Sequence, residues 1–431
     1  MQAIERYFSL AAHETTVRRE ILAGVTTFLT MAYIIFVNPA ILADAGIDRD
    51  AAFVATCIAA AIGSLLMGLL ANYPIALAPG MGLNAFFTYT VVAQMGHSWQ
   101  TALGVVFLSG LIFLALSVLP VREWIVNAIP RTLKMAISAG IGMFLAIIAL
   151  KSAGIVVDSK PTLVQLGDLT APAAILAILG FFAMIAMDRL KVPGAILIAI
   201  IAVTIIAMIG GLQNFGGIAS APPSLAPTLL ELDLASALEL GLISVVFAFL
   251  FVDLFDTSGT LIGVAHRAGL LDENGKLPRL RSALLADSLA TVAGAALGTS
   301  TTTSYIESAA GIRAGGKTGL TAVVVAILFL GCLFFAPLAG SIPAYATAPA
   351  LLFVACMMAR GLSEIDWEDV TEYAPAVVTA LAMPLTFSIA TGIGMGIITY
   401  AAVKLLSGRM SDASPAILVL AVAFVLNFIF L

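Results

Sequence analysis

Charged residues are scarce in this chain. Only 10% of its 431 residues are Asp, Glu, Lys or Arg, whereas 61% are hydrophobic and the mean hydropathy is +1.09. Because a soluble globular chain carries about 25% charged residues, this composition excludes a sizeable water-soluble domain. The sequence therefore predicts an all-α polytopic membrane protein, whose helices satisfy their own backbone hydrogen bonds inside the bilayer.

Cysteine and histidine are also rare. The three cysteines lie in apolar runs without a Cys-x-x-Cys spacing, and we interpret them as small core residues. The three histidines are far apart and show no metal-ligand spacing, and no Ser/His/Asp or Cys/His grouping indicates a hydrolase. The formal net charge of −5 gives no reason to expect nucleic-acid binding. We therefore expect neither enzymatic activity nor a metal or cofactor.

Long apolar runs make up most of the sequence, and fourteen of them are interpreted as membrane spans. They lie at residues 21–42, 51–71, 74–94, 100–119, 133–150, 171–187, 193–211, 238–265, 282–298, 300–315, 317–338, 343–360, 374–389 and 392–407. Lys and Arg gather before the first span and after spans four, six, eight, ten and fourteen. By the positive-inside rule this side, with the N-terminal residues 1–20, is cytoplasmic.

The two ends of the chain need separate interpretation. The N-terminus is too polar for a cleaved signal peptide, so the first span is expected to be an uncleaved anchor in the plasma or inner membrane. A last apolar run, 414–431, lies within a C-terminal hydrophobic segment at 408–431. This run is long enough to span the bilayer, and a position on the membrane surface is the alternative.

A weak internal duplication indicates two halves. TAPAAILAILG at 170–180 resembles YAPAVVTALAM at 373–383, and each is followed by a short break and another apolar run. Seven spans per half is an odd number, so the halves have opposite orientation, as in many secondary transporters. This predicts a first repeat at 21–211, an extracellular loop at 212–237 and a second repeat at 238–407. Chance similarity between two Ala-rich helices is the alternative.

Spans three and ten are not expected to be regular helices. The third, YPIALAPGMGLNAFFTY, contains prolines and glycines that break a helix, and the tenth contains a Ser/Thr run at 299–304 that favours extended backbone. Each carries one strongly polar residue near its break, Asn84 or Glu307. Broken segments at corresponding places are the best sequence indication of a transporter site, and a helix beginning near Glu307 would direct its dipole there. The alternatives are an interhelical hydrogen bond for Asn84 and an ion pair with Arg313 for Glu307.

Two aspartates, Asp253 and Asp256, lie within the apolar run of span eight. Their spacing of three residues puts them on one face of a helix. A carboxylate in the hydrocarbon region costs roughly 2.5–3.5 kcal/mol on insertion scales, so both are expected to face a polar cavity or a partner. A buried structural network is the alternative, more so for Asp253. Asp287 in span nine lies nearer the cytoplasmic loop, and we interpret it as structural.

The stretch GIRAGGKT at 311–318 matches the phosphate-binding-loop pattern literally. Such a loop needs a preceding strand, a following helix and a soluble α/β domain. Here an apolar run follows the motif. We therefore interpret it as a cytoplasmic loop that does not bind ATP.

Several long motifs run along the chain. They are TTFLTMAYIIFVNP in span one, APGMGLNAFF in span three, FVDLFDTSGTL in span eight, ADSLATVAGAALGTSTTTSYIESAAG in spans nine and ten, and DWEDVTEYAPA before span thirteen. With these motifs the chain resembles, over nearly its whole length, the AzgA-like purine permeases, a branch of the nucleobase–cation symporter 2 (nucleobase–ascorbate transporter) family. The resemblance implies fourteen spans in two inverted seven-span repeats, divided into core and gate domains, with short strands in segments three and ten. It also implies uptake of adenine, guanine or hypoxanthine by proton symport.

The resemblance also implies a site. Asp256 and Glu307 would be the substrate carboxylates, with Asp253 and Asn84 as supporting or coupling polar residues. The span-eight Asp, where the xanthine and uracil branches have Glu, makes roles less transferable from those branches. Asp253, Asp256 and Glu307 are the candidates for proton coupling, because burial disfavours a charged carboxylate. The other candidate substrate contacts are Thr303 and, for stacking on a flat base, Phe86, Phe87, Phe251, Phe255 and Tyr305, each of which also suits plain core packing.

Two alternatives stay open. The same fold could carry uracil, xanthine or a small anion, although no Lys or Arg lies in the middle of spans one, three, eight or ten. A membrane-embedded enzyme or receptor is a different class, for which the sequence offers neither a nucleophile–base pair nor a signalling domain. A homodimer is one oligomeric state compatible with either transporter hypothesis.

Overall fold

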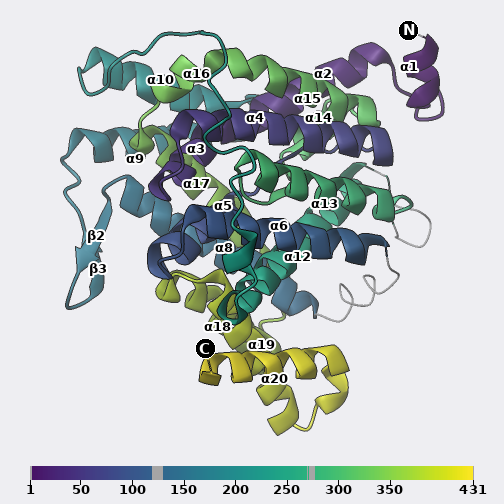
Figure 1. Ribbon diagram of the computed structural model, residues 1–431, viewed down its shortest axis with the longest axis vertical. Coiled ribbons are helices and arrows are strands. Elements are labelled where there is room, and N and C mark those ends of the chain that lie inside the picture. The colour runs from purple at the N-terminus through teal and green to yellow at the C-terminus, as the bar shows by residue number, and fades with distance from the viewer. Residues whose placement is uncertain (1, 119–129, 269, 271–276, 431) are drawn as a thin grey trace.

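The computed structural model describes residues 2–118, 130–268, 270 and 277–430, and it is largely helical (Figure 1). Within these ranges, nine helices are long and apolar enough to cross a membrane, and three further apolar helices are shorter. Most long helices run across the view of Figure 1, with α1 and α20 near opposite ends of the long axis. The predicted class, a helical polytopic membrane protein, is confirmed.

Besides its helices, the first half of the chain contains one short strand, two π-helical segments and a two-stranded hairpin. Its elements are α1 (Gln2–Tyr7), α2 (Val17–Met31), α3 (Ile34–Asp44), α4 (Arg49–Leu66), η1 (Met67–Ala71), β1 (Leu77–Pro79), α5 (Met81–Ala85), η2 (Phe86–Gln94), α6 (Trp99–Val118), α8 (Arg131–Ser152), β2 (Val156–Ser159), β3 (Leu163–Leu166), α9 (Pro172–Arg189), α10 (Ala195–Ile209) and α11 (Leu234–Ala237). The β2–β3 hairpin, which projects at the left of Figure 1, was not predicted from the sequence.

The second half of the chain consists of long helices, short helical segments and a single short strand. Its elements are α12 (Leu240–Ala268), α13 (Leu280–Leu297), β4 (Thr302–Ser304), α14 (Ser308–Arg313), α15 (Gly319–Cys332), η3 (Leu333–Phe335), α16 (Ala336–Gly340), α17 (Ala344–Ala359), η4 (Arg360–Glu364), α18 (Val370–Thr386), α19 (Ile389–Leu406), η5 (Met410–Asp412) and α20 (Pro415–Phe430). The last predicted apolar run, 414–431, contains helix α20, which packs against α19.

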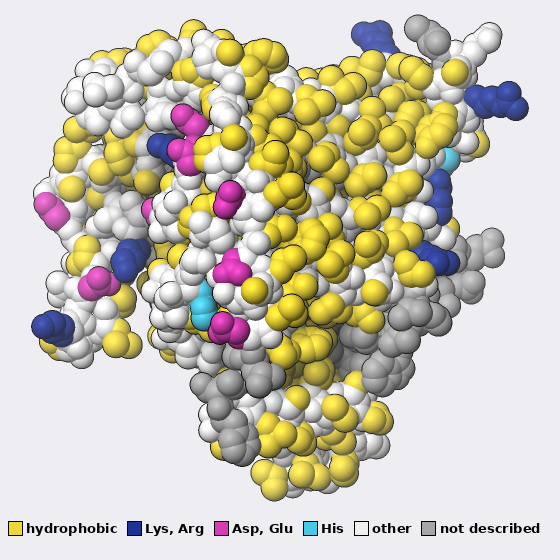
Figure 2. Space-filling view, viewed as in Figure 1, with side chains coloured by type: hydrophobic (Ala, Val, Ile, Leu, Met, Phe, Trp, Pro, Cys, Tyr) yellow, Lys and Arg dark blue, Asp and Glu magenta, His cyan; other side chains and the backbone are white. Residues whose placement is uncertain are grey.

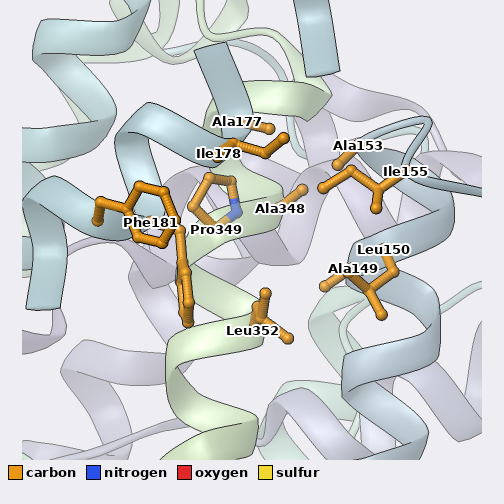
Figure 3. Close-up of a pocket in the computed structure, with 11 residues that line it drawn as sticks. Ala149, Leu150, Ala153, Ile155, Ala177, Ile178, Phe181, Ala348, Pro349 and Leu352 are labelled. Carbon is orange, nitrogen blue, oxygen red and sulfur yellow. The ribbon is translucent and has the colours of Figure 1, made fainter. Parts of the chain in front are cut away.

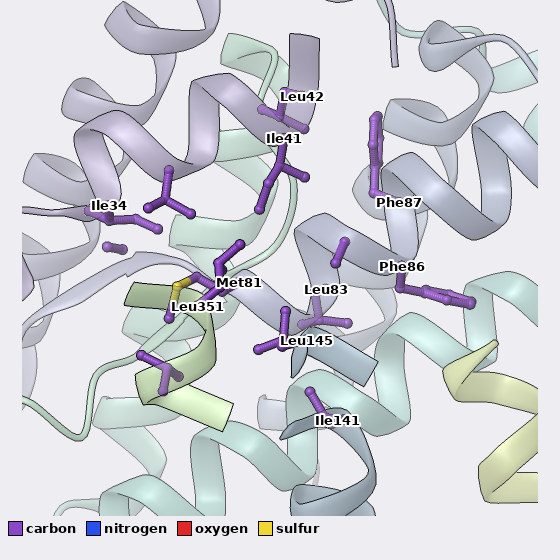
Figure 4. Close-up of a cluster of buried hydrophobic side chains, with 14 of the residues drawn as sticks. Ile34, Ile41, Leu42, Met81, Leu83, Phe86, Phe87, Ile141, Leu145 and Leu351 are labelled. Atoms are coloured by element: carbon purple, nitrogen blue, oxygen red, sulfur yellow. The ribbon is translucent and has the colours of Figure 1, made fainter. Parts of the chain in front are cut away.

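The helices pack in two groups. In the first bundle, α13 lies against α4 and α6, α15 lies against α2 and α4, and α12 contacts α6 and α14. In the second bundle, α8 lies against α17 and α18, α9 contacts α10 and α17, and α18 packs on α19. Figure 4 shows apolar side chains where the bundles meet, from α3 and α5 on one side and from α8 and α17 on the other. In Figure 2, acidic side chains form a column left of the centre of the face and several basic side chains lie at the right edge, with a broad hydrophobic surface between them.

The broken segments meet as a two-stranded antiparallel sheet. Strand β1 pairs with β4 in a register that sets Ala78 opposite Thr303, and all residues of both strands are buried. The Gly80 amide extends the pairing by donating to the Thr301 carbonyl at 2.9 Å. Pairing satisfies backbone groups that a broken helix would leave exposed to hydrocarbon. The short strands expected in segments three and ten are thereby confirmed, and each leads into a short helix, α5 or α14.

Span one is less regular than the sequence indicated. It was predicted as one run, 21–42, whereas the structure has α2 and α3 separated by Ala32 and Tyr33. Pro39 lies inside α3 and cannot donate a helical hydrogen bond. Thr30, at the end of α2, directs its hydroxyl to the carbonyls of its own helix at Thr26 and Thr27. Both features weaken helical continuity around Tyr33.

Buried charge is paired at one end of the second bundle. Lys404 of α19 has a side chain with 0% exposure, and its ammonium donates to Glu372 at 2.6 Å and to the Thr371 hydroxyl at 2.8 Å. Beside it, Arg409 pairs with Asp369 and Asp412. Hydrogen bonds from Thr371 and Arg409 lower the pKa of Asp369 to about 2. These contacts join the start of α18 to the end of α19.

Candidate functional site

Glu307 lies at the N-terminus of α14, immediately after the paired strands. The Tyr33 hydroxyl donates to Glu307 Oε1 at 2.6 Å, and the Thr30 hydroxyl lies 3.4 Å from the Glu307 carbonyl oxygen. Among the ion pairs of the described residues, none involves Glu307. The alternative of an ion pair with Arg313 is therefore not what this structure contains. Helix α14 does begin next to Glu307, as predicted.

Asp256 reaches the same region from α12. The Thr303 hydroxyl of β4 donates a hydrogen bond to its carboxylate. Asp256 and Glu307 are near enough to interact electrostatically, and both also interact with Tyr305. The structure thus brings Asp256 of span eight close to Thr303, Tyr305 and Glu307 of span ten, all of which were candidate site residues.

Asn84 is buried without a hydrogen-bond partner. Its side chain in α5 has 0% exposure, and neither the amide oxygen nor the amide nitrogen is paired. The interhelical hydrogen bond considered for Asn84 is therefore not formed. An unsatisfied buried polar group costs about 1–3 kcal/mol, and a ligand or an ordered water that bonds to the amide would remove this cost.

More unpaired oxygens line the broken segments. They belong to buried hydroxyl groups of the Ser/Thr run and of η2, namely Ser300, Thr301, Thr302, Ser304 and Thr88. Native proteins leave few such groups unpaired. Their concentration around β4 indicates an interior built to contact polar atoms that are not part of the chain.

Asp253 contacts a different element from Asp256. Its side chain is 1% exposed, and one oxygen accepts from Thr291 of α13 at 3.3 Å while the other has no partner. Its largest electrostatic neighbour is Asp287, which is fully buried and accepts from Thr257 at 2.9 Å. Asp253 therefore lies behind Asp256, between α12 and α13.

The aromatic candidates are mostly packed in the interior. The Phe86 ring lies 5.0 Å from that of Phe249, and Phe87 is 0% exposed. The Phe251 ring stacks on Phe247, and the Tyr305 hydroxyl donates to the Pro79 carbonyl at 2.6 Å. The side chain of Phe255 lies outside the described residues.

The phosphate-loop pattern has another use. The backbone amides of Lys317 and Thr318 donate to the carboxylate of Glu20, at 3.0 and 3.2 Å, and the Thr321 hydroxyl donates to it at 2.6 Å. Glu20 is 0% exposed. The amides that would face a phosphate in a nucleotide-binding loop are thus occupied by a carboxylate of α2. This supports the interpretation of 311–318 as a connecting loop.

A separate cavity lies away from these polar groups. It has a volume of about 120 Å³ and lies between α8, α9 and α17, lined by side chains such as Phe181, Pro349 and Leu352 (Figure 3). Its lining is apolar throughout. A binding site needs a few placed polar groups to fix the orientation of a polar ligand, so the cluster around Asp256 and Glu307 is the better candidate.

Sequence reasoning did not single out Tyr33. The residue lies in the span-one motif TMAYIIFVNP, but nothing in that motif indicates a contact with Glu307, 274 positions away. The only available signal was a tyrosine near the middle of an apolar run. Such a hydroxyl needs a hydrogen-bond partner when buried.

Comparisons with known proteins agree with the motifs. The Permease family (Xan_ur_permease) matches residues 18–426. A putative permease of Methanocaldococcus jannaschii is 54% identical over 100% of this chain and 99% of its own length. The adenine permease AdeP of Escherichia coli is 47% identical over 99% of this chain and 96% of its own, and the guanine/hypoxanthine permease PbuO of Bacillus subtilis is 45% identical over 97% and 98%.

A solved structure shares the fold. The transmembrane domain of the cyanobacterial bicarbonate transporter BicA superimposes with a TM-score of 0.67, covering 87% of this chain and 97% of that domain. Its sequence identity is 19%, so the likeness concerns the fold alone.

Proposed function

The chain belongs to the Permease family, and from this premise we propose that it imports the purine nucleobases adenine, guanine or hypoxanthine by proton symport. The observation that carries the proposal is that two carboxyl groups, Asp256 and Glu307, are close enough to interact, while the other broken segment contains the buried, unpaired amide of Asn84. The printed activities of AdeP and PbuO support the same class of substrate.

These groups suit a flat base edged with N–H donors and ring-nitrogen acceptors. An ionised carboxylate only accepts hydrogen bonds, whereas an amide both donates and accepts. Asp256 and Glu307 therefore match N–H groups on a purine, and the Asn84 amide matches an edge that presents both kinds of atom. The unpaired hydroxyls of the Ser/Thr run offer further donors and acceptors. A cluster with these properties favours a neutral heterocycle over an apolar cargo.

Proton coupling follows from the same carboxyl groups. A buried carboxylate is costly, and a proton removes its charge. Moving one charge through a membrane potential is worth about 2.3 kcal/mol per 100 mV. Protonation of Asp256, Glu307 or Asp253 from outside would lower the cost of reorienting the loaded site, and release inside would complete symport.

The finer architecture belongs to this proposal as well. We assign fourteen spans in two inverted repeats at 21–211 and 238–407, the N-terminus in the cytoplasm and the chain in the plasma or inner membrane. The first bundle would be the core domain and the second the gate. The pairing of β1 with β4, one from each half of the chain, supports this assignment. Movement of one bundle against the other would give alternating access.

Uptake into proteoliposomes tests the function. Purified protein is reconstituted, an inward proton gradient is imposed, and entry of radiolabelled adenine, guanine and hypoxanthine is measured with and without a protonophore. The proposal expects saturable uptake of at least one of these bases, weakened by the protonophore. Labelled uracil, xanthine and bicarbonate are assayed in the same way, and each is also added unlabelled as a competitor of purine uptake. If one of these is transported and no purine of the three is, the assigned substrate class is wrong.

A further inference from the structure

The hydroxyl of Tyr33 is committed to a single partner. Tyr33 is 0% exposed and lies in the two-residue interval between α2 and α3. Its one hydroxyl proton is donated to Glu307 Oε1 at 2.6 Å, a short distance typical of a bond to a charged acceptor. The other buried tyrosine at the site, Tyr305, donates instead to the Pro79 carbonyl and leaves Glu307 to Tyr33.

Glu307 is held at its backbone on two sides. The Thr30 hydroxyl approaches the Glu307 carbonyl at 3.4 Å. On the strand side, the Ala76 amide donates to the hydroxyl of Ser308 at 3.0 Å, next in the chain. These contacts fix the start of α14, but a glutamate side chain still has three rotatable bonds. Its carboxyl group needs a contact of its own to stay in one orientation.

We propose that Tyr33 is the positioning residue of Glu307: it occupies Oε1 and holds the carboxyl group so that Oε2 faces the substrate. This inference rests on the proposed function, because it assigns Glu307 to base recognition. A tyrosine is suited to the task, since it has two side-chain torsions and its ring is fixed by burial. The Glu307 side chain is then already ordered before substrate binds, so binding loses less side-chain entropy.

The arrangement repeats at the second carboxyl group. Asp256 accepts a hydrogen bond from the Thr303 hydroxyl. Each of the two candidate substrate carboxyls is thus tied to a hydroxyl from another segment, Glu307 to Tyr33 in span one and Asp256 to Thr303 in β4. A carboxylate has about four acceptor positions, so one bond of this kind leaves room for a base N–H. Removing the hydroxyl should leave the acid present but poorly oriented.

The test compares two tyrosine-to-carboxylate bonds. Tyr33→Phe removes the bond to Glu307 and little else. The matched control is Tyr89→Phe in η2, which removes a bond of 2.7 Å to Asp44 away from the site. Dissociation constants for adenine, guanine and hypoxanthine are measured by calorimetry on the purified full-length protein. KM and Vmax come from uptake into proteoliposomes, and unfolding temperatures are taken without base.

We expect Tyr33→Phe to raise the dissociation constant and KM about tenfold, the size of one hydrogen bond to a charged group, with Vmax changed less. The control should leave both constants within about twofold, and the two variants should unfold at similar temperatures. In a Glu307→Ala background, adding Tyr33→Phe should change binding less than about twofold, because the group that Tyr33 positions is already absent.

Several outcomes overturn the proposal. Equal affinities for Tyr33→Phe and Tyr89→Phe would do so, as would a loss of thermal stability with unchanged affinity. A full tenfold effect in the Glu307→Ala background would show that Tyr33 acts by another route. If Tyr33→Phe does not fold, Tyr33→Met replaces it, because methionine also fills apolar space without offering a hydroxyl to Glu307; an increase in the dissociation constant is expected, and an unchanged value contradicts the idea. Wild-type protein that binds none of the three bases would refute the proposed function instead.

Discussion

Replacing Glu307 with glutamine should convert a hydrogen-bond acceptor into a donor at the centre of the site. Gln keeps the length of the side chain, and its carbonyl oxygen can still accept from Tyr33. The position of Oε2 is then taken by an NH2 group, which points a donor at the base N–H that the carboxylate would have bound. The change therefore tests recognition without creating a cavity.

The magnitude follows from the type of bond. A hydrogen bond to a charged group is worth about 1.5–3 kcal/mol, which corresponds to about a 10- to 100-fold loss in affinity. Donor–donor opposition in the variant adds to this loss, so the upper part of the range is expected. The assay is uptake of labelled base into proteoliposomes together with binding to the purified protein.

The control is Glu231→Gln, which makes the same chemical change at an exposed loop position. It should leave binding and uptake unchanged. Glu307→Gln protein that is folded, inserted and as active as wild type would refute the assignment of Glu307. A loss of uptake with unchanged binding would instead assign Glu307 to proton coupling alone.

Three further substitutions test contacts that stabilise the fold, one at the strand pair and two at the end of the second bundle. A Cβ on Gly80 would lie 2.9 Å from Thr303 Cγ2, so Gly80→Ala should disturb the strand pair by about 1–3 kcal/mol of overpacking and lower uptake, whereas Gly331→Ala, with nothing within 4 Å, should not. Lys404→Met leaves Glu372 without its buried cation and should lower the unfolding temperature markedly, since breaking such a pair costs about 3–5 kcal/mol; Lys151→Met, which breaks an exposed pair, should change it little. Because the pKa of Asp369 is lowered in the folded protein, its pairing stabilises the fold above the unfolded pKa of about 4, and this stabilisation is lost as pH falls toward about 2. Asp369→Asn removes this titration, so the unfolding temperature of the variant should fall less steeply with pH over that range.

The broken segments could be predicted because their cause is local. Prolines and glycines near Asn84 deny the helix its hydrogen bonds, and β-branched residues at 299–304 favour extended backbone. The structure has β1 and β4 where these signals lie. Their pairing with each other was not predicted, since no local pattern states which strand a given strand will contact.

The partners of the acidic residues were harder to predict. Sequence spacing put Asp253 and Asp256 on one helix face, but α12 has different neighbours along that face, so Asp256 meets Thr303 whereas Asp253 meets Thr291. The contact of Tyr33 with Glu307 depends on how α2, α3 and α14 pack. A single sequence does not show which residues from distant segments will contact each other. Asp287 was judged by its distance from a loop, and its full burial depends on the packing of α13 against α4 and α6.

The division of polar and apolar groups between the bundles bears on the proposed mechanism. Asp256 lies on α12, Glu307 precedes α14 and Tyr33 follows α2, all helices of the first bundle, and Thr303 lies on β4, which packs against α12 and α13. The second bundle meets α3 and α5 with aliphatic side chains of α8 and α17 (Figure 4). Sliding at this apolar contact breaks no directional bond, so in the proposed mechanism the bundles would shift while a substrate kept its hydrogen bonds to the first bundle.

The two bundles are also joined by directional contacts, which such a movement would have to break. Two hydrogen bonds join the bundles where α18 ends: the Thr90 hydroxyl donates to the Phe387 carbonyl at 2.6 Å, and the Gln94 amide donates to the Thr386 carbonyl at 3.4 Å. Phe387 has a φ of 51°, a left-handed conformation that is costly for a residue with a side chain. In the proposed cycle, opening between η2 and α18 breaks these two bonds, whose groups can then bond to water. The left-handed turn at Phe387 belongs to the end of α18 itself, where its amide donates to the Met383 carbonyl. Two states of similar free energy are what a reversible carrier requires, since a deep minimum on either side would slow its return.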